Sequence, residues 1–577
     1  MGTREIIPMV HKLNCRLLLP GSKSITNRAF LCAALAKGKS RIYGALESDD
    51  TSAMLNALRK LQIPISKFKT AIVIDGCGGQ LLPGNRTVDA GASGTTTRFL
   101  TALSVLRKGK THILGTKRMK ERPMGDLVDA LSQLKSGKKV ISIKGNTSSQ
   151  FLSSLLMISP ALAEPIQIKV IGKLVSKPYI DTTLAVMRAF GVTVKHDDYK
   201  TFHIQPAPYK GTDYQVEGDA SAASYFSSLN FLHDGHLSFE NLNYKKSIQG
   251  DVNYPEALRK LRVKSSKLRV IDMGAMPDAA MTLTVTAPFV AGKTKITGLS
   301  TLKLKETDRL KALETELRKV GVQVRAGRDS LTVESLSSGR GSVTSPSPNV
   351  STYDDHRMAM SFAVFGTRVP GVIIEDPDCT AKTYPKFWDD LEKAYLSPIP
   401  LGTKNLVLIG MRCSGKNYHG AKIAKLLGRK FIDLDLEIEM AEKMKIAEIV
   451  KLKGWGYFRE AEQKICSKFS KAFADKKLPP SVIATGGGVV LDSKNMKSFQ
   501  KHSVVVFIYA DPHVLLERIK KTPLARPALT DKKIEHEIHE LWEHRRPLYL
   551  KYADYVWDDT SGIIVGQHYR DIFGATK

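Results

Sequence analysis

The sequence of 577 residues lacks the features that would direct it to a membrane or to the secretory pathway. Its six cysteines are scattered without CxxC pairs, which is typical of reduced cytosolic thiols and not of a disulfide framework. The N-terminal residues do not form a secretory signal, Ile6 breaks the myristoylation pattern, and no apolar run is long enough to span a bilayer. We therefore expect a cytoplasmic protein with no membrane partner.

Acidic and aromatic residues are also scarce. The chain has 87 Lys and Arg against 57 Asp and Glu, a net charge of +30, and only 7% aromatic residues. Such a charge suits nucleic acid, an acidic membrane surface or small anionic substrates. Because no block of basic residues, zinc-finger spacing or RNA-recognition pattern is present, we expect no nucleic-acid partner. A binding assay at low salt tests this expectation, since a charge-driven complex should weaken steeply as salt is added. Small anionic molecules are the favoured partners.

The composition, with 42% hydrophobic and 25% charged residues, indicates a globular chain, and its length predicts two to four domains. Six similar segments close amphipathic helices, and the first five lead into predicted strands. This recurrence predicts six similar units in two halves, unless it reflects only the common order of helix, basic last turn and strand in α/β proteins. The segments are Leu58–Leu61, Leu131–Leu134, Met187–Phe190, Leu258–Leu261, Leu317–Val320 and Leu391–Ala394.

A change of character after Ala394 predicts a domain boundary. Residues 395–403 contain two prolines and a glycine, and a new buried strand begins near Leu406. We predict one domain over residues 1–396, a linker at 397–403 and another domain over 404–577.

The first domain concentrates charge at a predicted strand-to-helix corner. Ile296 belongs to the strand, and apolar residues from Leu310 to Val320 recur at helical spacing. Glu306 and Asp308 suit the positive end of the helix, but Lys305 and Arg309 do not. A bound anion explains the cations, since helix starts are natural anion sites. Cations, hydroxyls and small-residue turns recur at other element ends, including those at Lys23, Gly94, Arg122, Ser148 and Lys382.

Ten motifs in order identify a family over residues 12–395. They are PGSKSxxNR, GTTTR, MKERP, SSQF, SKPYID, EGDASAASYF, PDAAMT, KETDRL, DDHRMAM and CTAKT, and together they closely resemble 5-enolpyruvylshikimate-3-phosphate (EPSP) synthase. The resemblance implies an α/β fold with two subdomains, residues 21–218 and residues 1–20 plus 219–396, each built of three βαβαββ units. UDP-N-acetylglucosamine enolpyruvyl transferase shares this fold, but the KETDRL and DDHRMAM runs favour the shikimate enzyme.

The same resemblance implies the site residues. Asp278 and Glu306 are the candidate acid and base, with Lys23, Lys305 and His356 as further catalytic candidates. Phosphoenolpyruvate is expected to bind Lys23, Gly94, Arg122, Arg309, Arg357 and Lys382. Shikimate 3-phosphate is expected to bind Lys23, Ser24, Arg28, Ser148, Ser149, Gln150, Ser176, Tyr179, Asp278 and Lys305. Ala92 and Thr301 replace residues that are usually Asn, so side-chain contacts at these two positions do not carry over.

The C-terminal domain contains a phosphate loop between a strand and a helix. Gly410, Cys413, Ser414, Gly415, Lys416 and Asn417 are the predicted ATP-binding residues of this loop. Asn417 occupies the position where Ser or Thr normally ligates magnesium, and an amide oxygen is a bulkier ligand than a hydroxyl. Binding without efficient phosphoryl transfer is therefore an alternative for this domain.

Five further motifs resemble shikimate kinase over residues 404–557: FIDLD, YFREAE, TGGG, ARP and RRPLY. The resemblance implies a parallel sheet flanked by helices and a requirement for ATP and Mg²⁺. Asp435, which is also a catalytic candidate, is expected to bind shikimate with Arg459, Gly487 and Arg545. Asp433 is expected to place magnesium together with Asn417, and Arg526 to close over the phosphates of ATP.

The two resemblances together predict a bifunctional shikimate-pathway enzyme, because the kinase product is the transferase substrate. The order resembles part of the pentafunctional AROM polypeptide, so other shikimate-pathway domains or enzymes are possible partners. The alternative is an active transferase that carries a weak or inactive kinase-like binding module.

Overall fold

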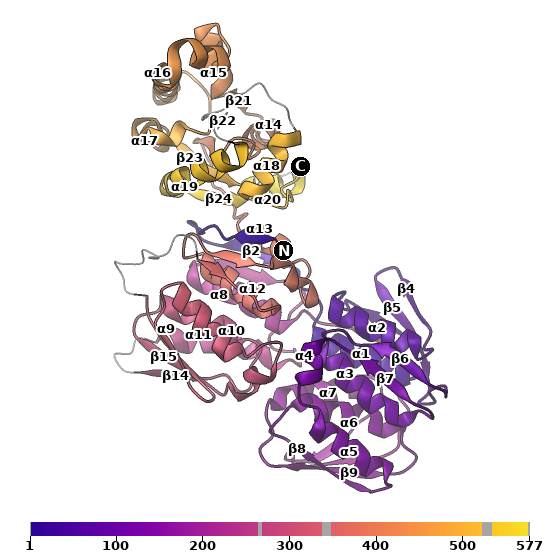
Figure 1. Ribbon diagram of the computed structural model, residues 1–577. Coiled ribbons are helices and arrows are strands. Elements are labelled where there is room, and N and C mark those ends of the chain that lie inside the picture. Colours follow the sequence, from indigo (N-terminus) through magenta and orange to yellow (C-terminus); the bar gives the residue numbers. More distant parts are fainter. Residues whose placement is uncertain (1, 264–267, 337–347, 522–532, 575–577) are drawn as a thin grey trace.

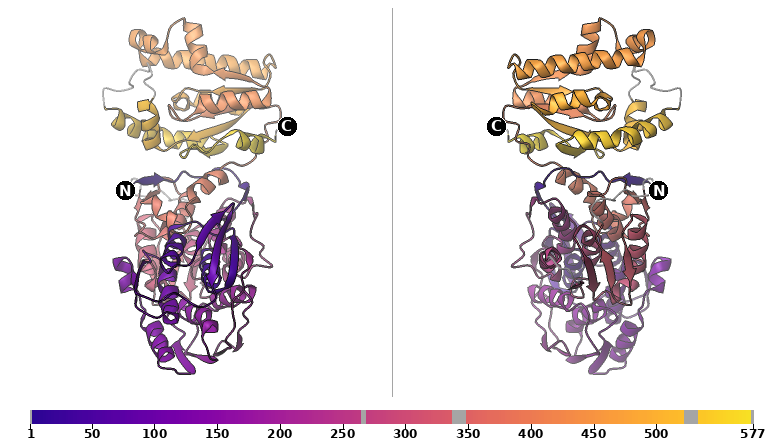
Figure 2. Two further views of the ribbon diagram at one scale, coloured as in Figure 1. Left: turned by 90° about the vertical axis from the view of Figure 1, so that its right-hand side faces the viewer. Right: turned by 90° about the vertical axis from the view of Figure 1, so that its left-hand side faces the viewer.

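The computed structural model describes residues 2–263, 268–336, 348–521 and 533–574. Residues 21–218, called the first lobe here, lie beside a second lobe made of residues 2–20 and 219–396 (Figure 1). A C-terminal lobe follows from Asn405 onward and lies against the second lobe (Figures 1 and 2). Arg526 is outside the described residues, so its predicted role stays a prediction.

The first lobe is built of three sheets packed around buried helices. Helix α1 is buried along almost its whole length, and one apolar cluster extends from Ile25 to Val216. The sheets have the orders β12 (Asp213–Gln215), β3 (Lys37–Tyr43), β5 (Ala71–Cys77), β4 (Ile65–Phe68); β6 (Arg86–Asp89), β7 (Thr111–Leu114); and β10 (Lys195–Asp197), β11 (Thr201–Ile204), β9 (Ile166–Ile171), β8 (Val140–Lys144). The helices are α1 (Lys23–Leu35), α2 (Asp49–Lys60), α3 (Gly94–Leu103), α4 (Lys117–Glu121), α5 (Gly125–Lys135), α6 (Ser149–Ile158) and α7 (Lys177–Ala189).

The second lobe repeats this construction. Its sheets have the orders β13 (His236–Phe239), β2 (Asn14–Leu17); β14 (Arg269–Asp272), β15 (Lys293–Thr297), β17 (Leu331–Glu334), β16 (Val324–Ala326); and β1 (Thr3–Glu5), β19 (Ile373–Glu375), β18 (Asn349–Val350). Its helices are α8 (Ala220–Leu232), α9 (Tyr254–Arg262), α10 (Ala280–Thr286), α11 (Arg309–Lys319), α12 (His356–Gly366) and α13 (Phe387–Ala394), with short 3-10 helices η5 (Ser300–Leu304) and η6 (Pro377–Lys382).

The described part of the two lobes therefore contains six small sheets. Three have four strands, and two of these follow the order βαβαββ directly along the chain, β8 to β11 and β14 to β17. The third takes β12 from later in the chain, and the remaining sheets have two or three strands. The six predicted helix ends are confirmed, since they close α2, α5, α7, α9, α11 and α13.

The chain passes between the two lobes at two glycines. Gly21 and Gly218 form an isolated β-bridge. Gly21 is required by close packing, because a Cβ there would lie 1.9 Å from the carbonyl oxygen of Gly44. The subdomain boundaries at residues 21 and 218 stay a prediction.

The C-terminal lobe has the predicted parallel sheet. Its order is β21 (Lys430–Asp433), β22 (Ser481–Ala484), β20 (Asn405–Ile409), β23 (Ser503–Tyr509), β24 (Tyr555–Asp558), and every pairing is parallel. Strands β20 and β23 are buried along their length, as expected for a sheet covered on both faces. The helices are α14 (Lys416–Leu427), α15 (Leu434–Glu442), α16 (Ile446–Ala474), α17 (Ser493–Gln500), α18 (Pro512–Lys521), α19 (Ile534–Tyr552) and α20 (Gly566–Phe573).

The predicted linker at 397–403 contains no helix or strand, but it is not a free tether. Ile399 and Leu401 are buried in the apolar cluster of the C-terminal lobe, and the Ile399 amide donates to the carbonyl of Ile572. Its apolar side chains explain this packing. Among the described helices, none has the length and apolarity needed to cross a membrane.

Candidate active sites

A polar pocket lies where the first and second lobes meet. Fifteen of the seventeen residues predicted for the transferase site line it: Lys23, Ser24, Gly94, Arg122, Ser148, Ser149, Gln150, Ser176, Tyr179, Asp278, Lys305, Glu306, Arg309, His356 and Arg357. Lys382 lines a neighbouring pocket that shares Arg122 and Glu306 with the first. The structure thus gathers residues that are more than 300 positions apart in the sequence.

The fold explains why anions suit this pocket. Helices α1, α3, α6, α7, α11 and α12 each contribute a residue of the first turn, among them Lys23, Thr95, Ser149, Arg309 and His356. Free backbone N–H groups and the positive end of the helix dipole favour anions at such positions. Six cationic side chains and three carboxylates line the same pocket, so the side chains add net positive charge.

Asp278 is held by three cations. Its carboxylate lies 3.1 Å from Arg357, 3.4 Å from Lys305 and 3.4 Å from Arg309. Burial alone would raise the pKa of Asp278, but these cations outweigh it and hold that pKa well below its ordinary value. Asp278 is therefore ionised at neutral pH.

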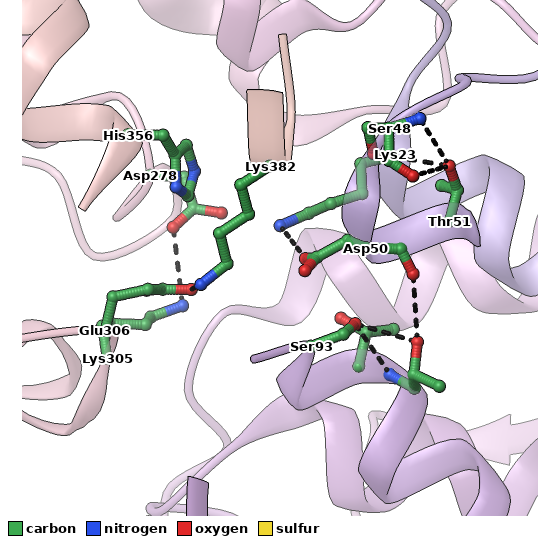
Figure 3. Close-up of polar contacts among 12 residues, drawn as sticks. Lys23, Ser48, Asp50, Thr51, Ser93, Asp278, Lys305, Glu306, His356 and Lys382 are labelled. Atoms are coloured by element: carbon green, nitrogen blue, oxygen red, sulfur yellow. Dashed lines mark hydrogen bonds and ion pairs between the residues drawn. The ribbon is translucent and has the colours of Figure 1, made fainter. Parts of the chain in front are cut away.

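Glu306 has its own set of cations on the other side of the corner. Its carboxylate lies 2.8 Å from Arg309, 3.5 Å from Lys382 and 3.8 Å from Arg122. Figure 3 shows Lys382 extending to Glu306 and Lys305 reaching Asp278. Burial alone would raise the pKa of Glu306, but the same three cations outweigh burial and hold that pKa well below its ordinary value.

The predicted corner is confirmed in detail. Asp308 caps helix α11, and its side chain accepts a hydrogen bond from the amide of Lys311 at 3.2 Å. Arg309 is 1% exposed and binds Asp355 through Nε at 2.7 Å. Its guanidinium thus connects Asp278, Glu306 and Asp355 in one network.

Burial lowers the pKa of two further predicted catalytic residues, His356 and Lys305. Burial, followed by the charges of Arg357 and Lys23, lowers the pKa of His356 well below its ordinary value, so the imidazole is neutral. Within the described part of the chain, neither ring nitrogen has a hydrogen-bond partner. Burial also lowers the pKa of Lys305, although Asp278 opposes that shift.

Gly94 lies directly against the guanidinium of Arg122. A Cβ at position 94 would lie 2.7 Å from Nη1 of Arg122 and 2.9 Å from its Cζ. The Cα therefore forms part of the surface that positions this cation. Any larger side chain must displace Arg122 or close the space in front of it.

Asp251 was missed by the sequence reasoning. It is 4% exposed, and the hydroxyl of Tyr179 donates to Asp278 at 3.0 Å and to Asp251 at 3.3 Å. Burial and the nearby charge of Asp278 raise the pKa of Asp251 to about 7. No local pattern identifies this residue, because the contact joins η3 (Gly250–Asn253) to a helix of the other lobe.

Arg98 and Asp50 were also missed, and both line the pocket. Arg98 donates to Gln150, and Lys23 binds Asp50 at 3.2 Å, as Figure 3 shows for the latter pair. Arg98 ends the GTTTR motif, which gave it no role of its own, and no sequence pattern marks Asp50 in the first turn of helix α2.

Arg28 is the predicted substrate ligand that lines neither of these two pockets. It is 1% exposed, and its guanidinium donates to Thr183 at 2.7 Å and to the Ser24 carbonyl at 2.8 Å. It lies behind Ser24 and Tyr179, which do line the pocket. Its role as a direct ligand stays a prediction.

A second pocket lies in the C-terminal lobe. It brings together all four predicted shikimate ligands and one of the two predicted magnesium ligands, namely Asp435, Arg459, Gly487, Arg545 and Asp433. Arg412, Glu439 and Glu462 add charged groups to which the sequence analysis assigned no role, and Trp455 and Phe458 add an apolar wall. Mixed charged and apolar walls suit a small polar ring compound.

Three buried polar atoms of this pocket have no hydrogen-bond partner among the residues that the structure describes. They are Nε of Arg412, Nε of Arg545 and Oε1 of Glu462. Because unpaired buried polar atoms are costly, they point to a polar ligand that completes their bonding. Gly488 lies beside them, and a Cβ there would lie 2.1 Å from the Arg459 guanidinium, so a larger residue would displace that cation.

The phosphate loop follows β20 and precedes α14, as predicted. Cys413 has a positive φ of 62°, and Gly415 has a φ of 96°, which gives the loop its turn. Lys416 donates to the carbonyls of Gly410 at 3.0 Å and Met411 at 2.7 Å. Nδ2 of Asn417 donates to Oδ2 of Asp433 at 2.5 Å.

Comparison with known proteins assigns both parts of the chain. The family model of EPSP synthase (3-phosphoshikimate 1-carboxyvinyltransferase) matches residues 8–391, and that of shikimate kinase matches residues 412–566. A 3-phosphoshikimate 1-carboxyvinyltransferase of Hamiltonella defensa is 40% identical over 425 residues, which cover 67% of this chain and 97% of that protein.

Two solved structures of EPSP synthase from Acinetobacter baumannii support the fold of the first two lobes. They match with TM-scores of 0.54 and 0.55 at 22% identity, covering 68% of this chain and 98% of theirs. The chain belongs to the EPSP synthase family. A shikimate kinase domain follows, so the whole is a bifunctional shikimate-pathway enzyme, as predicted.

Proposed function

We propose that the pocket between the lobes transfers the enolpyruvyl group of phosphoenolpyruvate to shikimate 3-phosphate, with Asp278 and Glu306 moving the protons. The observation that carries this proposal is the pair of ionised carboxylates, each held by cations, at the convergence of six helix starts. Both substrates carry phosphate and carboxylate groups. The cations offset the repulsion between these groups when they are brought together.

The reaction needs a proton taken from the attacking hydroxyl and a proton given to the methylene carbon of phosphoenolpyruvate. The C–O bond then forms at the enol carbon, and phosphate leaves as a proton is lost from the new methyl group. Asp278 is ionised beside Tyr179, a proposed ligand of shikimate 3-phosphate, and it serves as the base for the hydroxyl.

Glu306 serves as the acid. Arg122, Arg309 and Lys382, which hold its pKa low, are the proposed ligands of phosphoenolpyruvate. When the substrate phosphate and carboxylate neutralise these cations, the pKa of Glu306 rises and the carboxyl takes up a proton. The binding of the anion therefore prepares the acid that the chemistry requires.

Asp278→Asn tests this assignment. It should lower turnover by about 10²- to 10⁴-fold with a smaller change in substrate KM. Asp234→Asn, at an exposed pair with Arg262, is the matched control. Turnover equal to the wild type would remove Asp278 from the mechanism.

In the second pocket we propose that Asp435, Arg459, Gly487 and Arg545 hold shikimate and that the phosphate loop holds ATP. The backbone amides of the loop cradle phosphates, and Lys416 exchanges its carbonyl contacts for the transferred phosphoryl group. Asp435 orients the attacking hydroxyl and accepts its proton, because it lines the pocket that the loop borders.

The residues beside the loop fit magnesium. Asp433 offers a carboxylate and Asn417 an amide oxygen, and Mg²⁺ needs only one or two such ligands when phosphates and waters complete its shell. Since the Asn417 amide nitrogen donates to Asp433, the two side chains already lie together. When bound, the ion neutralises charge that develops between the β- and γ-phosphates.

That same contact favours the second candidate function, a weak kinase. The bond between Asn417 and Asp433 occupies a carboxylate oxygen that magnesium would need. Formation of ADP from ATP by the whole chain, with and without shikimate and over a range of Mg²⁺ concentrations, separates the two functions. Shikimate-dependent turnover supports the kinase, whereas saturable ATP binding without turnover supports the weak module.

A further inference from the structure

Strand β1 lies between the two enzymes, although it belongs to the second lobe. It pairs with β19 through Glu5 and Ile373. The side chains of Arg4 and Glu5 reach the C-terminal lobe, where they contact Asp558 and Trp542. Figures 1 and 2 show the N-terminal segment at the face on which the C-terminal lobe lies. Buried polar groups make this contact. They keep their partners only while the two lobes hold the same relative position.

Glu5 makes the most directed of these contacts. Its side chain is 8% exposed and accepts a hydrogen bond from the indole Nε1 of Trp542 at 2.7 Å. It also forms an ion pair with Arg546. Both partners belong to helix α19 of the kinase domain, so one carboxylate of the transferase part holds that helix at two points.

Helix α19 connects this contact to three parts of the kinase pocket. Arg545, next to Arg546, lines the pocket. Glu537 binds Arg412 of the phosphate loop, and the hydroxyl of Tyr549 donates to the carbonyl of Gly487. A rotation or shift of α19 would therefore move several walls of the pocket together.

Aromatic packing makes the connection stiff. Trp542 is 1% exposed and packs on Tyr509 at 5.2 Å and on Phe507 at 6.3 Å between ring centroids. Tyr549 stacks on Phe507 at 4.9 Å with an interplanar angle of 18°. Phe507 lies beside Ile409, the last residue of β20 before the phosphate loop. Close-packed interiors transmit such displacements instead of absorbing them.

We propose that Glu5 of the transferase part is a positioning residue of the kinase site, which sets the place of Arg545 through helix α19. This inference rests on the proposed binding of shikimate by Arg545. The kinase pocket thus takes part of its support from outside the segment that carries its own motifs.

The test uses the whole chain and the variant Glu5→Gln. Glutamine keeps the shape and an oxygen that accepts from Trp542, but it removes the charge that holds Arg546. We expect the KM for shikimate to rise roughly three- to tenfold, with the KM for ATP and the transferase kinetics within about twofold of the wild type. Glu5→Asp, which keeps the charge, should recover part of the loss.

Arg546→Gln removes the same ion pair from the kinase side. It keeps the test valid if the Glu5 variant does not fold. It should raise the KM for shikimate similarly, and the double variant should be no worse than either single variant, because the residues act as one unit. Glu240→Gln, at an exposed pair with Arg16 in the same lobe, is the control.

An unchanged KM for shikimate in both single variants would overturn the proposal, and so would an equal loss for ATP and shikimate together with a lower Tm. Arg545→Lys separates this failure from failure of the proposed site. If Arg545→Lys leaves the KM for shikimate unchanged, the ligand assignment is wrong. If it raises that KM while Glu5→Gln does not, only the positioning role is lost.

Discussion

Glu306→Gln is the substitution that separates binding from chemistry in the transferase pocket. The carboxylate is 11% exposed and lies 2.8 Å from Arg309 and 3.5 Å from Lys382. Glutamine fits the same space and removes only the charge and the exchangeable proton. If Glu306 is the acid, turnover should fall by about 10²- to 10⁴-fold, or about 3 to 5 kcal/mol in the activation free energy.

Affinity should respond in the opposite sense. Two unit charges 4 Å apart interact by about 4 kcal/mol at an effective dielectric constant of about 20, so Glu306 strongly offsets the cations around it. Without its charge, Arg309 and Lys382 present a stronger field to an incoming phosphate. We therefore expect the KM for phosphoenolpyruvate to stay equal or to fall while kcat collapses.

The assay is steady-state phosphate release from phosphoenolpyruvate with shikimate 3-phosphate in excess, with Tm measured on the same samples. Glu256→Gln, at an exposed pair with Arg259 in the same lobe, is the control. A kcat within threefold of the wild type would refute the role of Glu306 as an acid. A large rise in KM with unchanged kcat would show that it acts only in binding.

Three further outcomes follow from individual contacts. Gly94→Ala should raise the KM for phosphoenolpyruvate by roughly tenfold, because the new Cβ displaces Arg122, and an unchanged KM would contradict that geometry. Asn417→Ser should raise magnesium-dependent kinase turnover by about tenfold in an ADP assay, since a hydroxyl replaces the amide that holds Asp433, and equal turnover would show that this position is not limiting. Burial and Asp558 raise the pKa of Glu392 from 4.5 to about 8, so the folded chain holds a proton that the unfolded chain releases, and stability should fall as pH rises through that window. Tm measured from pH 5 to 9 should show a weaker dependence in Glu392→Gln, and identical profiles would contradict the shift.

Local sequence patterns predicted the elements that carry the chemistry. Asp308 caps its helix and Arg309 begins it, because charge and helical periodicity are encoded within a few residues. The phosphate loop lies between β20 and α14 for the same reason. The family resemblance then chose residues on separate elements, and the fold brings fifteen of them to one pocket.

Contacts between distant segments could not be predicted in this way. Glu5 and Trp542 are 537 positions apart, and neither has a neighbouring pattern that marks the other. Asp251 gains its raised pKa only because folding buries it beside Asp278. The apolar residues Ile399 and Leu401 were assigned to a linker from the prolines around them, but burial in the C-terminal lobe decides their place.

The central claim is that the positive charge of this chain serves two separate pockets for small anions, used in sequence. Its most direct test supplies the whole chain with shikimate, ATP, Mg²⁺ and phosphoenolpyruvate, and follows ADP and inorganic phosphate separately. ADP should form with shikimate, ATP and Mg²⁺ before phosphoenolpyruvate is added, and phosphate should appear only after that addition. Absence of phosphate release even when shikimate 3-phosphate is supplied directly with phosphoenolpyruvate would contradict the account.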